Sequence, residues 1–221
     1  LDVQSSQLDS ETLAAADIPA SSAVADPVLV HAVRRLIEDL SRAERPLLLL
    51  GAGIRIAGAA DLAVELIDRL RVPFATTWIS TDLVDDQHPC FAGRPGAFAS
   101  RGANFAVQNS DLLLSIGARW DFATTGFSHH GFARAARRVV VDVDPAELDK
   151  LRAVAECCIH ADARVFLAEV LRQLPAQFSR DRHASWLARV ENWRKRYPVV
   201  TEDLRRPPEG VSTYVFVEAL A

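Results

Sequence analysis

The sequence of 221 residues contains no methionine and only three cysteines. A complete natural chain starts with methionine, so its absence predicts a piece of a longer protein. Cys90, Cys157 and Cys158 are odd in number and two are adjacent, which excludes a disulfide framework and favours a reducing cytoplasm. The adjacent pair precedes His160, but the CxxC and HxxxH spacings of metal sites are missing. We therefore expect small buried residues on a strand here, and assign no metal site.

Long apolar runs and long basic runs are also lacking. The longest apolar candidate, residues 46–56, is shorter than the roughly 20 residues that span a bilayer and contains glycine, so no membrane association is expected. No basic segment precedes an apolar one at the N-terminus, as a signal peptide would require. The net charge is -4, which makes nucleic acid an unsuitable partner. Hydrophobic residues at 49% and charged residues at 24% fit a globular core.

Apolar segments bounded by Gly, Pro and acidic residues predict alternating strands and helices. Asp26-Pro27 is typical of a helix N-terminus, and Leu29, Val33 and Leu36 follow on one helical face. A helix is expected after the glycines at 51–53, and others near 102–110 and after Asp162. Buried strands are expected at 47–50, 72–77, 111–117, 138–144 and 156–160. The predicted fold class is α/β: a doubly wound, mostly parallel sheet with helices on both faces, resembling a Rossmann fold.

The character of the chain changes after Pro175. Trp186, Val190, Trp193 and Tyr197 share one helical face, which either packs on the core, the favoured interpretation, or docks on a partner. Residues 201–210 are polar and rich in proline, as in a linker. A new amphipathic segment begins after Ser212.

In doubly wound sheets ligands bind at the carboxyl ends of strands. Gly51-Ala52-Gly53 starts like a dinucleotide fingerprint, but the third glycine of GxGxxG is replaced by Ile56. The second strand ends in Thr76-Thr77, where an NAD site would carry an acid. The glycines therefore serve either a dinucleotide or simply a tight turn, and a standard NAD site is disfavoured.

Three charged residues follow two other predicted strands. Arg119 is expected at the rim of the ligand crevice, where it would bind a phosphate or pair with Asp121 or Asp142. Asp142 and Asp144 would hold ribose hydroxyls or cap the next helical turn. No Ser, His and acid set forms a nucleophile elbow, and His129-His130 lacks companions, so we assign no catalytic residue.

Together these segments resemble the central domain of acetolactate synthases and related thiamine-diphosphate enzymes. The resemblance covers roughly residues 20–180. It is carried by GAG at 51–53, PFATTWIS at 73–80, ANFAVQNSDLLLSIGARWD at 103–121, TTGF at 124–127 and VDVDPAELDKL at 141–151.

The resemblance implies a domain organisation. Residues 1–25 would be a linker from an N-terminal pyrimidine-binding domain, 26–180 the central domain, 181–210 a helix and linker, and 211–221 the start of a C-terminal diphosphate-binding domain. In the family, the activating Glu lies in the first domain, and the GDG…N motif for Mg²⁺ and thiamine diphosphate lies in the third. This chain would then have no turnover alone. Its partners would be those two domains and further copies of the protein, as a dimer or tetramer.

The resemblance also implies candidate FAD contacts, because the central domain of acetolactate synthases binds FAD. They are Gly51, Gly53, Thr77, Trp78, Arg119, Asp142, Val143, Glu147 and Asp162. Two differences from the family's sequence remove some of the polar side chains that contact FAD. Phe98-Ala99 stands where the family has His-Gly, and Phe122-Ala123 stands where it has Asp-Arg. Some members keep the fold without flavin, so FAD binding stays open.

Three functions stay open at this stage. The preferred one is a cofactor-supporting, structural domain of a thiamine-diphosphate-dependent 2-keto acid decarboxylase or carboligase. The second is a free-standing module that binds FAD or another nucleotide without thiamine chemistry. The third is a remnant that makes protein contacts through the helix bearing Trp186 and Trp193.

Overall fold

The computed structural model describes residues 7, 9, 11, 24–176, 178, 182–207 and 209–220. Most of the predicted linker at 1–25 lies outside the described residues. The first helix of the described residues is α1 (Pro27–Arg42), whose N-terminus is capped as predicted, because the Asp26 carboxylate accepts a hydrogen bond from Leu29 N at 2.7 Å.

The core is a six-stranded sheet in which every strand pair is parallel, and the predicted fold class is confirmed. The strands run in the spatial order β3-β2-β1-β4-β5-β6. They are β1 (Pro46–Leu50), β2 (Phe74–Thr76), β3 (Phe91–Gly93), β4 (Leu112–Ile116), β5 (Arg137–Asp142) and β6 (Cys157–His160). The chain moves outward from β1 to β3 and then returns to β4 on the other side of β1. This reversal places a topological switch point between β1 and β4.

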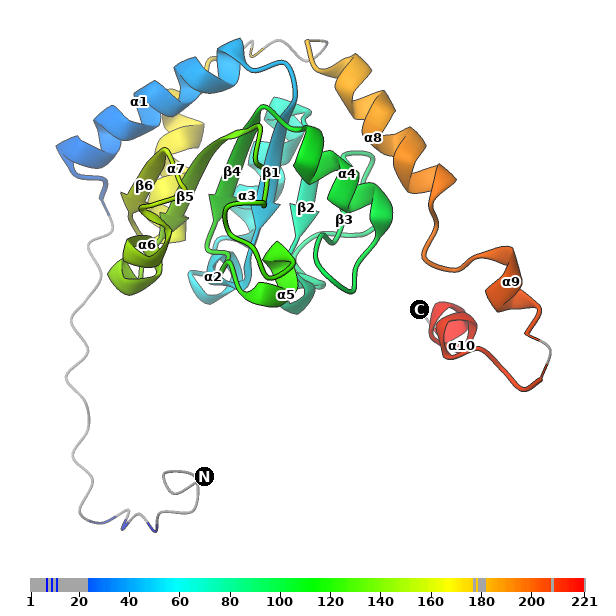
Figure 1. The fold of residues 1–221 in the computed structure, drawn as a ribbon. Coiled ribbons are helices and arrows are strands. Elements are labelled where there is room, and N and C mark those ends of the chain that lie inside the picture. Colours follow the sequence, from blue (N-terminus) through cyan, green and yellow to red (C-terminus); the bar gives the residue numbers. More distant parts are fainter. Residues whose placement is uncertain are drawn as a thin grey trace.

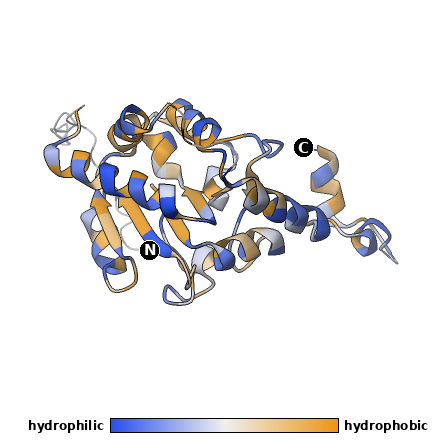
Figure 2. Ribbon diagram, turned by 90° about the horizontal axis from the view of Figure 1, so that it is seen from above, coloured by the Kyte–Doolittle hydropathy of each residue, from blue (hydrophilic) through white to orange (hydrophobic). Residues whose placement is uncertain are grey.

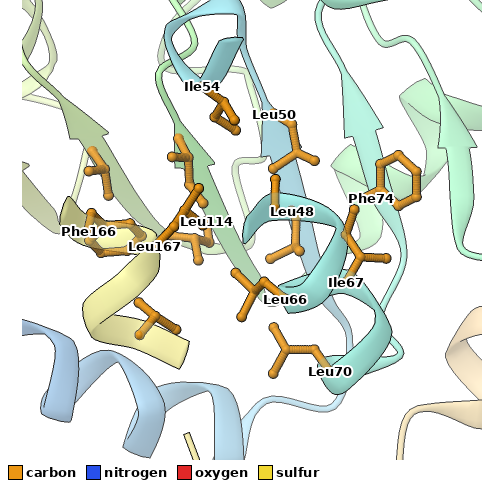
Figure 3. Close-up of a cluster of buried hydrophobic side chains, with 14 of the residues drawn as sticks. Leu48, Leu50, Ile54, Leu66, Ile67, Leu70, Phe74, Leu114, Phe166 and Leu167 are labelled. Atoms are coloured by element: carbon orange, nitrogen blue, oxygen red, sulfur yellow. The ribbon is translucent and has the colours of Figure 1, made fainter. Parts of the chain in front are cut away.

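Helices cover both faces of the sheet, as Figures 1 and 2 show. One face packs against α1, α3 (Ala60–Leu70) and α7 (Ala163–Gln173), and the other against α4 (Arg101–Asn109), α6 (Pro145–Leu151) and α8 (Ala184–Arg196). Successive side chains of a strand point to opposite faces. Leu48 and Leu50 therefore lie in the first core, shown in Figure 3, and Leu47 and Leu49 in the second. The four-leucine run is explained by burial on both sides.

Three sequence predictions need correction in detail. The helix expected after the glycines is two helices, α2 (Ala52–Ile56) and α3, separated at Gly58, whose φ is +62°. The strand expected to reach residue 144 stops at Asp142, because the Asp142 carboxylate accepts a hydrogen bond from Asp144 N at 2.9 Å and turns the chain. The strand expected at 72–77 is shorter, and β3 was not predicted at all.

The helix after Pro175 belongs to the core. Trp186 and Val190 of α8 are buried, and the Trp186 indole donates to the Pro46 carbonyl at 2.9 Å. The core-packing interpretation is therefore confirmed. Beyond α8, Figure 1 shows α9 (Glu202–Arg205), which lies within the predicted linker, and α10 (Thr213–Leu220), both apart from the sheet.

Candidate functional site

A cavity of about 540 Å³ opens at the carboxyl ends of β1, β4 and β5, the end of the sheet where Figure 1 places α2 and α5 (Phe122–Thr125). Its volume falls in the range of roughly 300–1,000 Å³ typical of small-molecule sites. We call it the crevice. The structure brings together there all the predicted site residues except Gly51, namely Gly53, Thr77, Trp78, Arg119, Asp142, Val143, Glu147 and Asp162.

The two glycines of the β1–α2 turn are required by protein packing. A β-carbon on Gly51 would lie 2.1 Å from the Gly117 carbonyl oxygen, and one on Gly53 would lie 2.7 Å from the Gly117 Cα. Gly117 itself has φ +56° and accepts a hydrogen bond from Gly53 N at 3.0 Å. The contact between the turns after β1 and β4 thus accounts for both glycines, which by themselves do not indicate a dinucleotide.

Arg119 stands at the rim of the crevice and pairs with Glu147. Its Nε and Nη2 donate to Glu147 Oε1 at 3.1 and 2.8 Å, and the Lys150 ammonium donates to Oε2 of the same carboxylate. The expectation that a partner would be Asp121 or Asp142 was wrong. Glu147 is one turn into α6, which brings its carboxylate back toward the end of β4.

The shared carboxylate is ionised under ordinary conditions. Burial alone would raise the pKa of Glu147, but hydrogen bonds and charges from Lys150 and Arg119 outweigh burial and hold its pKa below the usual value of 4.5. The Arg119 side chain is 74% exposed, whereas Glu147 is 13% exposed. The guanidinium can therefore reach a ligand, while Lys150 continues to compensate Glu147.

Four aspartates around the crevice each use one carboxylate oxygen for local structure. Asp121, Asp144 and Asp162 cap α5, α6 and α7 through Oδ1, and Asp142 Oδ1 accepts from Asp144 N. Asp144 is thus a cap, one of its two predicted roles. Within the described part of the chain, no hydrogen bond or ion pair engages the Oδ2 atom of any of the four. The crevice therefore offers acceptors, which suit hydroxyl or N–H donors of a ligand.

The lining of the crevice also includes exposed apolar side chains. Ile56, Trp78 and Val143 are 84%, 63% and 63% exposed there, which is unusual for large apolar side chains. Arg55 joins α2 to the segment after β2 by donating to the Ile79 carbonyl at 3.2 Å and pairing with Asp82. Chemically, the crevice combines exposed apolar side chains, the exposed guanidinium of Arg119 and several carboxylate acceptors.

Sequence reasoning missed several lining residues, notably Ile56 and Thr124. Ile56 was considered only as the failed third glycine. Their positions in the sequence could have indicated them, because each residue lies in the short helix that follows a strand's carboxyl end. The two departures at Phe98 and Phe122 do not line the crevice, and their rings are 92% and 67% exposed.

Metal and membrane sites are not found in the described part of the chain. Among residues 24–176 and the other described positions, no group of three or more His, Cys, Asp or Glu side chains could hold a metal ion. Likewise, no helix among the described residues is long and apolar enough to cross a membrane.

Comparison with known proteins places the chain in a family. Residues 33–174 match the family described as thiamine pyrophosphate enzyme, central domain. The acetolactate synthase large subunit of Parasynechococcus marenigrum is 34% identical over 193 residues, which are 87% of this chain and 30% of that protein.

Two further relatives carry similar names. The probable acetolactate synthase large subunit of Methanocaldococcus jannaschii is 31% identical over 88% of this chain and 33% of its own length. The acetolactate synthase isozyme 2 large subunit of Escherichia coli is 32% identical over 75% of this chain and 30% of its own length. The chain thus spans about a third of the length of these relatives. It belongs to the thiamine pyrophosphate enzyme family, as an acetolactate synthase-like central domain.

Proposed function

We propose that this domain supports a thiamine-diphosphate-dependent 2-keto acid decarboxylation or carboligation within an intact, acetolactate synthase-like enzyme. The match of residues 33–174 to the family's central domain is the observation that carries this proposal. When bound, thiamine diphosphate would supply the nucleophilic carbon that attacks the keto acid. No residue of this chain is assigned to that chemistry. The domain would shape the site entrance and help to hold an oligomer, a dimer or tetramer, in the cytoplasm.

The proposed division of the chain rests on the resemblance to the family, and the match of residues 33–174 supports its central part. Residues 26–180 would be the central domain, with 1–25 and 181–210 as connections to a pyrimidine-binding and a diphosphate-binding domain, the latter starting at 211–221. The experiment is to sequence the gene on both sides. A downstream GDG…N motif and an upstream α/β domain with the activating Glu are expected. A stop codon directly after Ala221 would contradict the proposal.

We further propose that the crevice holds FAD or another nucleotide that has a flat ring and ribose hydroxyls. Trp78 would stack on the ring, the Asp142 and Asp162 Oδ2 atoms would accept from hydroxyl groups, and Arg119 would approach a phosphate. Among the described residues, the crevice lining holds one guanidinium, that of Arg119, and the nearby Phe122-Ala123 stands where the family has Asp-Arg. We therefore expect weaker FAD binding than in relatives that keep those residues.

Titration of the purified chain with FAD, followed by flavin fluorescence, tests the crevice. Binding should quench flavin fluorescence, because Trp78 would stack on the ring, and Trp78→Ala should abolish much of that quenching. Phe98→Ala is the matched control, since Phe98 is exposed and lies outside the crevice. Unchanged fluorescence at high micromolar flavin would leave this chain with the structural role alone.

A further inference from the structure

A second cavity of about 480 Å³ lies beside the crevice, on the outer side of Arg119. We call it the α5 groove, and its lining includes Phe122, Phe127, Arg119, Lys150 and His129. We propose that the α5 groove binds a flat aromatic ring that carries a phosphate, the chemistry of a nucleoside monophosphate. This inference does not depend on a ligand in the crevice.

Two aromatic rings form the apolar part of the groove. The rings of Phe122 and Phe127 are stacked, with centroids 5.7 Å apart and planes inclined by 11°. The two residues are 67% and 72% exposed, so the pair faces solvent across much of its surface. An aromatic ring of a ligand can extend such an offset stack and bury the exposed area.

The backbone under this pair is strained. Phe127 has φ +67°, directly after Gly126 at φ +62°. Part of the arrangement is an ordinary helix end, because Phe127 N donates to the Phe122 carbonyl at 3.0 Å and an apolar contact across that bond is common. That motif requires the left-handed conformation only at the glycine. A bulky residue held there as well is an outlier of the kind found at binding sites.

The polar part of the groove contains two cationic groups that a phosphate could contact, Arg119 and Lys150. Arg119 and Lys150 share the single carboxylate of Glu147, so these three groups together carry one net positive charge. Asp121, the acidic residue of the lining, caps α5 through Oδ1 and adds a second negative charge, so an anion would bind through direct contacts with Arg119 and Lys150 and not through net charge. A phosphate is a suitable partner for a guanidinium and an ammonium placed side by side. Rings and cations thus line one cavity, as a nucleotide requires.

Calorimetric titration of the chain with AMP tests the proposal. Adenosine, which lacks the phosphate, and ribose 5-phosphate, which lacks the ring, are the paired probes. AMP should bind at least tenfold more tightly than either. Phe122→Ala, Phe127→Gly and Lys150→Gln should each weaken AMP binding by tenfold or more. Phe98→Ala removes an even more exposed phenylalanine outside the groove and should bind AMP as the wild type does.

The Phe127→Gly variant keeps the test independent of folding, since glycine accepts the left-handed backbone. Three results would overturn the proposal. The first is no binding of AMP by the wild-type chain at millimolar concentration. The second is unchanged AMP affinity in Phe122→Ala and Phe127→Gly, which would leave the ring pair as a helix end only. The third is loss of AMP binding in Trp78→Ala alone, which would place the nucleotide in the crevice. Failure of FAD to bind in the crevice would not change the result expected from any of these AMP titrations.

Discussion

The carbonyl oxygen of Gly117 occupies the space where a β-carbon of Gly51 would lie, 2.1 Å away. The contact is between backbone atoms of the turns after β1 and β4, so neither turn can move away without disturbing these two strands. Gly51→Ala should therefore lower the free energy of unfolding by about 3 kcal/mol, at the upper end of overpacking costs. Chemical denaturation of the purified chain measures the change.

Gly58→Ala is the control for that substitution. Gly58 has φ +62° but nothing within 4 Å of an added β-carbon, so only backbone strain is introduced, at a cost of about 1 kcal/mol. Equal effects of the two substitutions would show that the Gly51–Gly117 contact is not what requires glycine.

Glu147 should make stability depend on pH in the acid range. Its pKa is lowered in the folded state, so its contribution is complete above the ordinary value of 4.5 and is lost as pH falls through the lower folded pKa. Glu147→Gln should cost about 1 kcal/mol at pH 7, and the difference from wild type should shrink as the pH falls below the ordinary value of 4.5. Denaturation at several pH values measures both quantities.

Glu191→Gln is the comparison for Glu147. Glu191 pairs with Lys195 on the exposed side of α8 at 2.6 Å, and its side chain is 48% exposed. Such an exposed pair is screened by solvent and contributes little to stability, so the change at pH 7 should be smaller than for Glu147→Gln. An effect of Glu147→Gln that does not shrink on acidification would contradict the account.

His183 should make the fold less stable near pH 5.5 than near pH 7.5. The residue is fully buried, its Nε2 donates to the Ala43 carbonyl at 3.0 Å, and its Nδ1 has no hydrogen-bond partner among the described residues. Burial lowers its pKa from the usual 6.5. The unfolded chain therefore binds a proton that the folded chain resists, and stability falls as pH drops through the ordinary value toward the folded one.

Thermal unfolding at the two pH values measures this slope. His183→Gln keeps a donor for the Ala43 carbonyl without titrating, so its Tm should depend less on pH in this range than that of the wild type. His31→Gln, at an exposed position of α1, should leave the wild-type slope unchanged. An identical slope in His183→Gln would show that another group titrates.

Trp186 should contribute strongly to stability. It is 3% exposed and donates to the Pro46 carbonyl at 2.9 Å, so Trp186→Ala both opens a cavity and leaves a buried carbonyl unpaired. A loss of about 3–5 kcal/mol in the free energy of unfolding is expected, and a smaller one for the half-buried Trp193→Ala. If α8 were a docking helix, both substitutions would leave stability nearly unchanged.

The sequence pattern correctly predicted the strands that form unbroken apolar segments. The leucine run in β1 and the valines of β5 are buried on both faces, and each gives an unbroken apolar segment in the sequence. In contrast, β3 has three residues and pairs only with β2, at an irregular register, so its local pattern carries little information. The break at Gly58 was also undetected, because leucine spacing continues beyond it.

The sequence predicted where the crevice lies, but it did not predict which acidic residue pairs with Arg119. Strand ends can be found from the sequence, which located Arg119 and the aspartates correctly. Which acid meets Arg119 depends on how α6 turns back after β5, a tertiary relationship that spacing does not encode. The strain at Phe127 is equally invisible in sequence, since only the backbone angle distinguishes it from any other loop phenylalanine.

The central proposal is that this domain works within a thiamine-diphosphate enzyme, and one assay tests it most directly. Release of CO₂ from pyruvate and other 2-keto acids is measured with the full-length protein that contains this chain, and with the chain alone. The full-length protein should release CO₂ only when both thiamine diphosphate and Mg²⁺ are present, and the chain alone should release none. Turnover that needs neither cofactor, or turnover by the isolated chain, would contradict the proposal.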